Sequence, residues 1–128
     1  MRKRYFVGNL KMNLLSREEA YQYLSILRRE AFGKHFGDTV GIICPPVIYS
    51  HAFDHLPDSF LKGAQDVSCE KEGAFTGEIS PVMLKNDRCD YVIVGHSERR
   101  SYGGDTDDVV GKKVRTALKH HLIPIVCI

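Results

Sequence analysis

Short apolar runs alternate with amphipathic stretches along the whole chain. The run Tyr91–Val94 contains three β-branched residues and is followed at once by a glycine and a cluster of ionisable side chains. This composition is typical of a buried strand in a parallel sheet. Four other runs have a similar character. The five predicted strands are Tyr5–Leu10, Val40–Cys44, Phe60–Gln65, Asp90–Val94 and Leu122–Ile128.

Helical patterns fill the gaps between these strands. Ser16 is followed three residues later by Glu19, which is the spacing of a capping box, and apolar residues then recur at helical spacing up to a stop at Gly33. Strands and helices alternating in units of about thirty residues predict βαβ units and a parallel sheet. The four predicted helices begin after Ser16, at Val47, after Ser80 and after Thr106.

Length and composition narrow the class of protein. The 128 residues are 43% hydrophobic and 27% charged, which is expected of one globular domain spanning residues 1–128. A net charge of +2 gives no reason to expect nucleic acid or an anionic membrane as a partner. No apolar run is as long as a membrane span, and no secretory h-region follows the basic residues Arg2, Lys3 and Arg4. We therefore expect a cytoplasmic protein.

The four cysteines are far apart, and none has a histidine at ligand spacing. We expect free thiols, with no disulfide and no metal site. The chain contains neither a G-x-G-x-x-G motif nor a Walker P-loop, and no cofactor is expected. The cysteines are Cys44, Cys69, Cys89 and Cys127.

Candidate chemistry follows the first and the fourth predicted strand. Asn9 and Lys11 come at the end of one strand, and His96 comes two residues after Val94. Because the carboxyl ends of parallel strands open onto the same edge, we expect these three side chains to lie close together. An amide, an ammonium and an imidazole in one place can stabilise a developing oxyanion. From their positions alone, Lys11 could equally be an ordinary exposed lysine, and His96 could be a loop histidine that only hydrogen-bonds to backbone.

Four stretches of sequence carry a resemblance to a known family. They are Gly8–Asn13, Gly73–Ser80, Gly95–Arg100 and Pro124–Ile128, and they occur in order and at the expected places between strands. Together they resemble triosephosphate isomerase over the whole chain. The resemblance implies a (β/α)8 TIM barrel, of which this chain covers about the first half, with five strands and four helices. It also implies the glycolytic and gluconeogenic interconversion of dihydroxyacetone phosphate and D-glyceraldehyde 3-phosphate through an enediolate.

The same resemblance implies roles for individual residues. His96 would be a neutral imidazole at a helix N-terminus that polarises the substrate carbonyl and moves protons. Lys11 would neutralise the substrate phosphate and the developing enediolate, and Asn9 would hydrogen-bond a substrate oxygen. Ser97 and Glu98 would orient these groups. In the complete enzyme, a homodimer, the loop residues Phe75, Thr76 and Gly77 would reach into the partner subunit.

The chain departs from the family in one important respect. A complete barrel has eight βα units and about 250 residues. The general-base glutamate, the mobile lid and the glycine-rich phosphate loops of the family all lie beyond the fifth strand. We therefore expect a fragment that is inactive alone. Its first and last strands should be unpaired edges, and the inner faces of its helices should be exposed.

Two other interpretations remain open at this point. One is a non-catalytic half-barrel that binds phosphate or a partner. The other is an open, five-stranded α/β protein of the flavodoxin-like type.

Overall fold

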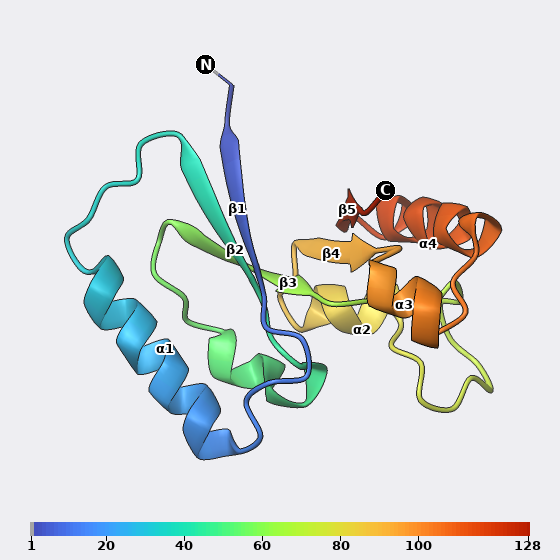
Figure 1. Ribbon diagram of the computed structural model, residues 1–128, viewed down its shortest axis with the longest axis horizontal. Coiled ribbons are helices and arrows are strands. Elements are labelled where there is room, and N and C mark those ends of the chain that lie inside the picture. The colour runs from blue at the N-terminus through green and yellow to red at the C-terminus, as the bar shows by residue number, and fades with distance from the viewer. Residues whose placement is uncertain (1) are drawn as a thin grey trace.

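Five parallel strands form the sheet of this protein. The computed structural model describes residues 2–128 and is drawn in Figure 1. All five predicted strands are present, and the last is shorter than predicted. The strands are β1 (Arg4–Asn9), β2 (Thr39–Cys44), β3 (Phe60–Ala64), β4 (Tyr91–Val94) and β5 (Ile123–Val126).

The strands pair in the order in which they occur in the sequence, β1-β2-β3-β4-β5. Every neighbouring pair is parallel. Crossovers between parallel strands are right-handed, so a sheet that always grows in one direction keeps its connections on one face. A flavodoxin-like sheet would reverse direction after its first crossover, so that interpretation is wrong. The predicted first half of a (β/α)8 barrel is confirmed.

The connections contain one more helix than the sequence predicted. The additional helix, α3, has the sequence Ser-Glu-Arg-Arg-Ser-Tyr and buries no residue, so it has no apolar periodicity to detect. No helix within residues 2–128 has the length and hydropathy needed to cross a membrane. The helices are α1 (Arg17–Ala31), the 3-10 helix η1 (Val47–Phe53), α2 (Pro81–Asn86), α3 (Ser97–Tyr102) and α4 (Asp107–Lys119).

The start of α1 matches half of the predicted capping box. The Ser16 hydroxyl accepts a hydrogen bond from the Glu19 backbone N–H at 3.1 Å. The Glu19 carboxylate, however, accepts from the Leu15 N–H at 2.7 Å and not from Ser16. Both bonds still satisfy backbone donors that the helix itself leaves free.

Alternate residues of each strand contribute to two different layers of the core. On β4, Val92 and Val94 are fully buried against α2 and α4. Their neighbours Tyr91 and Ile93 pack on the concave face of the sheet with Ile42 of β2. Figure 1 shows α1 beside η1 under the β1–β2 end of the sheet and α4 beside β5 at the other end. The helix faces that pack on the sheet are therefore covered, and the expectation that they would be exposed is wrong.

Both edges of the sheet carry exposed apolar side chains. In the described chain, β1 pairs only with β2, and β5 pairs only with β4. On β1, Tyr5 and Phe6 are 53% and 66% exposed, and on β5, Ile123 and Val126 are 51% and 45% exposed. Unpaired apolar strands of this kind are templates for association with other chains.

We predict that the isolated 128-residue chain associates into oligomers of mixed size. Placing a charge on each edge with Phe6→Lys and Ile123→Lys should reduce this association, because a lysine on an edge strand opposes pairing. Size-exclusion chromatography with light scattering measures the effect. Tyr102→Lys is the matched control, since Tyr102 is 91% exposed but lies on α3, away from both edges. A monodisperse monomer that melts cooperatively would contradict the prediction.

Candidate active site

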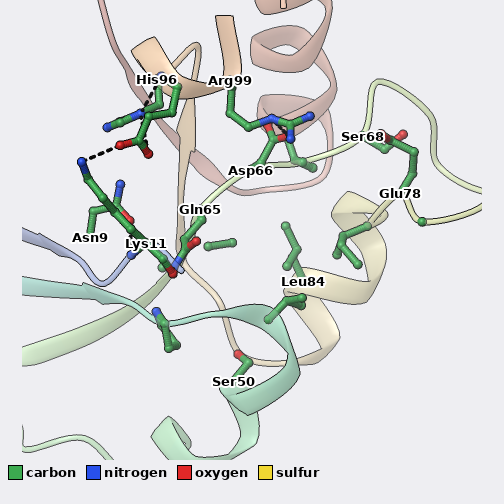
Figure 2. Close-up of a pocket in the computed structure, with 18 residues that line it drawn as sticks. Asn9, Lys11, Ser50, Gln65, Asp66, Ser68, Glu78, Leu84, His96 and Arg99 are labelled. Carbon is green, nitrogen blue, oxygen red and sulfur yellow. Dashed lines mark hydrogen bonds and ion pairs between the residues drawn. The ribbon is translucent and has the colours of Figure 1, made fainter. Parts of the chain in front are cut away.

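A cavity of about 300 Å³ opens at the carboxyl edge of the sheet. Asn9 and Lys11 line it from the end of β1, and His96 and Glu98 line it from the start of α3. Figure 2 shows Asn9, Lys11 and His96 on the same side of the cavity. The structure therefore brings together the three side chains that the sequence placed after two separate strands.

The Glu98 carboxylate connects the two candidate catalytic groups. Its Oε1 lies 2.7 Å from Lys11 Nζ, and its Oε2 lies 3.6 Å from His96 Nδ1. The hydrogen bond from Lys11 lowers the pKa of Glu98 below its ordinary value and outweighs the desolvation that would raise it. Glu98 is therefore a fixed negative charge at neutral pH that holds the lysine ammonium beside the imidazole.

Backbone geometry determines how His96 presents its ring. His96 is the N-cap of α3, and its Nδ1 accepts a hydrogen bond from the Glu98 N–H at 3.2 Å. An imidazole nitrogen that accepts has no proton, so the neutral ring carries its proton on Nε2. The preceding Gly95 has φ +73°, and a Cβ there would lie 3.0 Å from Val110 Cγ2. Only glycine fits this turn from β4 into α3.

Lys11 occupies a strained backbone conformation. Its φ of +55° lies in the left-handed region, which an unbranched L-residue adopts only when its surroundings impose it. The Asn9 side-chain oxygen accepts from the Lys11 N–H at 3.0 Å. Gln65 Nε2 donates to the Lys11 carbonyl at 2.9 Å and to the Cys44 carbonyl at 3.0 Å. Two amide side chains thus clamp the residue that carries the ammonium.

Gln65 is the site residue that sequence reasoning missed. It directly follows β3 and lies at the same carboxyl edge as Asn9 and His96. The rule that selected His96, a polar residue just after a buried strand, would also have selected Gln65.

A buried ion cluster lies beside the cavity. Lys113 Nζ lies 2.8 Å from Asp66 Oδ1 and 2.8 Å from Asp105 Oδ2. Burial lowers the pKa of Lys113, but hydrogen bonds to Asp105 and Asp66 outweigh burial and raise it overall. Arg99 Nε lies 3.0 Å from Asp66 Oδ2, and Arg100 pairs with Asp107 at 2.7 Å. Both arginines are therefore held in ion pairs with aspartates.

The remaining predicted residues lie at the margin of the cavity. Ser97 is the first residue of α3, is exposed, and is not among the residues lining the cavity. Phe75, at the tip of the predicted loop, is 47% exposed, whereas Gly77 lines the cavity. A backbone hydrogen bond from Glu78 N to the Phe75 carbonyl, at 3.0 Å, closes the tip into a tight turn around Thr76.

We predict that Lys11→Met raises the pKa of Glu98 toward its ordinary value of 4.5, because the lysine is the main cause of the lowered value. Because its pKa is lower in the folded than in the unfolded state, Glu98 stabilises the fold at pH values above its unfolded-state pKa. That contribution is lost as the pH falls through the folded-state pKa. A carboxyl-detected NMR titration in the soluble Phe6→Lys, Ile123→Lys background measures the shift. Lys34→Met, which removes an exposed lysine 4.0 Å from Glu30, should leave Glu98 unchanged.

Comparison with known proteins identifies the family. The family model described as triosephosphate isomerase matches residues 4–128. The chain is 44% identical over 129 residues to the triosephosphate isomerase of Alkaliphilus oremlandii and 40% identical over 137 residues to that of Dictyoglomus turgidum. Each alignment covers all of this chain and 51% of the relative. The enzyme of Roseiflexus sp. is 53% identical over 89 residues, which are 68% of this chain and 35% of the relative.

The chain thus spans about half the length of the curated relatives that it matches over its full length. Its sheet order, the positions of its cavity residues and a family match over nearly all of its length agree. The chain belongs to the triosephosphate isomerase family.

Proposed function

We propose that the protein to which this chain belongs interconverts dihydroxyacetone phosphate and D-glyceraldehyde 3-phosphate. The observation that carries the proposal is the arrangement at the cavity, where the Glu98 carboxylate binds the Lys11 ammonium at 2.7 Å and the Glu98 backbone N–H donates to His96 Nδ1 at 3.2 Å. Family membership supports the same substrate class. The reaction moves one proton between neighbouring carbons and needs neither a redox cofactor nor a metal.

The chemistry follows from where charge develops. Removal of a proton next to a carbonyl leaves an enediolate, so the carbonyl oxygen becomes negative in the transition state. A donor already aimed at that oxygen stabilises the transition state more than the substrate. The Nε2–H of His96 is that donor in our proposal, because Nδ1 is already used by the Glu98 N–H. The same ring then exchanges protons between the two enediolate oxygens.

Lys11 and Asn9 complete the proposed binding site. The ammonium of Lys11 attracts the substrate phosphate and offsets the enediolate charge, while Glu98 limits how far the long side chain can move. Asn9 has its carbonyl oxygen engaged by the Lys11 N–H, so its amide N–H₂ group is the part left to bind a substrate oxygen. Gln65 positions Lys11 through the backbone and does not itself need to touch substrate.

We propose that the chain alone has no general base and therefore cannot remove the substrate proton. In this proposal the base, the lid and the phosphate loops belong to the part of the protein beyond the fifth strand, and the match to about half the length of the relatives supports it. We further propose that the complete protein is a homodimer in which Phe75, Thr76 and Gly77 contact the partner subunit. A cytoplasmic location is part of the same proposal, and four free cysteines fit a reducing compartment.

We predict no isomerase activity above background for the purified 128-residue chain with either triose phosphate. Loss of a general base alone slows such reactions by about 10²–10⁴-fold, and the missing loops would remove binding as well. Fusing the chain to the C-terminal half of a relative such as the Alkaliphilus oremlandii enzyme should restore activity in a coupled assay. If the fused protein folds but stays inactive, the proposed function fails. Substrate binding by the chain alone without turnover after fusion would favour a phosphate-binding module.

In the restored enzyme, we predict that His96→Gln and Lys11→Ala have different kinetic effects. His96→Gln should lower kcat by about 10²-fold or more with little change in KM, because the imidazole acts on the transition state. Lys11→Ala should worsen both constants, because a cation attracts the phosphate of ground state and transition state alike. Steady-state kinetics measure both, and His55→Gln is the matched histidine control outside the cavity. Full turnover with His96→Gln would overturn the assigned role.

A further inference from the structure

A second ionisable cluster lies where η1, β3 and the end of α2 meet. Its central residue is Lys62 of β3, whose side chain is only 3% exposed. Lys62 Nζ lies 2.5 Å from Asp54 Oδ1 and 3.1 Å from Asp87 Oδ2. Asp54 is the C-cap of η1, and Asp87 is the C-cap of α2. None of these three residues lines the cavity described above.

Each carboxylate of this cluster has one inward and one outward oxygen. The inward oxygens bind Lys62, and Asp87 Oδ2 also accepts a hydrogen bond from the Ser50 hydroxyl. The outward oxygens face a single histidine. His51 Nδ1 lies 3.4 Å from Asp54 Oδ2 and 3.2 Å from Asp87 Oδ1. Lys62 therefore fixes the orientation of both carboxylates by binding their inward oxygens. Hydrogen-bond partners orient the ligands of a metal ion in the same way.

The three outward atoms have the spacing of metal ligands. The nitrogen and the two oxygens all lie within 4.8 Å of one another. Ligands bonded to one ion at about 2.0–2.2 Å in a tetrahedral arrangement lie about 3.4 Å apart, which is the separation of His51 Nδ1 from each oxygen. The His51 side chain is 88% exposed, so an ion can reach the group from solvent.

The charge of the cluster also suits a divalent cation. Two carboxylates and one ammonium leave a net charge of −1 when His51 is neutral. One imidazole nitrogen with two carboxylate oxygens is a donor set for zinc and similar transition metals, whereas calcium and magnesium prefer oxygen alone.

We propose that His51, Asp54 and Asp87 form a surface site for a divalent transition-metal ion such as Zn²⁺, with Lys62 as the residue that positions both carboxylates. Bound metal would tie the end of η1 to the end of α2. This site is independent of the proposed isomerase chemistry. No sequence pattern indicates this site, because Asp87 is 36 positions from His51 and only the fold brings them together.

Cobalt binding tests the proposal, because Co²⁺ occupies zinc sites and gives visible absorption bands when the site is four-coordinate. Equilibrium dialysis counts bound metal per chain whatever the oligomeric state. We expect one Co²⁺ per chain, visible bands that appear with it, and displacement of both by Zn²⁺. His51→Gln should weaken binding by roughly tenfold or more. This variant should fold normally, because the side chain that it changes is almost fully exposed.

Two further variants keep the result interpretable. His55→Gln removes a nearby exposed histidine that is not in the cluster and should bind Co²⁺ like the unmodified chain. Asp87→Asn should weaken binding like His51→Gln, with circular dichroism as the check that the chain is folded. The proposal is wrong if the unmodified chain binds no Co²⁺, or if His51→Gln binds as tightly as His55→Gln. These outcomes do not depend on isomerase activity.

Discussion

Each strand of this parallel sheet pairs with the strand that precedes it in the sequence, and this constraint decides most of the structure. Right-handed crossovers then keep the connections on one face of the sheet, and the carboxyl ends of the strands share one edge. Asn9, Gln65 and His96 lie at the carboxyl ends of three different strands and still line one cavity. The strand order, more than any single contact, therefore brings the site residues together.

Within the site, local strain is offset by hydrogen bonds to the Lys11 backbone from two amide side chains. A residue held in the left-handed region costs about 1–3 kcal/mol. Lys11 is held there by Asn9 and Gln65 through two hydrogen bonds, each contributing about 0.5–1.5 kcal/mol. The two hydrogen bonds together are of the same order as the cost of the conformation. The benefit is an ammonium in a defined position, 2.7 Å from Glu98.

Two buried lysines, Lys62 and Lys113, each lie between two aspartates. Removing one partner from such a group typically destabilises a protein by about 3–5 kcal/mol, because a charge is left buried and unpaired. The two groups differ in whether their carboxylate oxygens remain free to bind another cation. At Lys113, both oxygens of Asp66 are bound by Lys113, and Arg99 lies against the same carboxylate. At Lys62, one oxygen of each aspartate faces the exposed His51, which is why only this group has room for another cation.

The sequence by itself determined the five strands, four of the five helices and the identity of the main cavity residues. It could do so because buried strands are recognisable from local composition, and because the residue after such a strand lies at a known edge. It missed α3, whose six residues bury nothing and so leave no pattern, and it missed Gln65 as a positioning residue. Only the tertiary structure joined Lys11 to Glu98 and His51 to Asp87. Those pairs are 87 and 36 residues apart, and no periodicity along the chain encodes a distance set by the packing of separate elements.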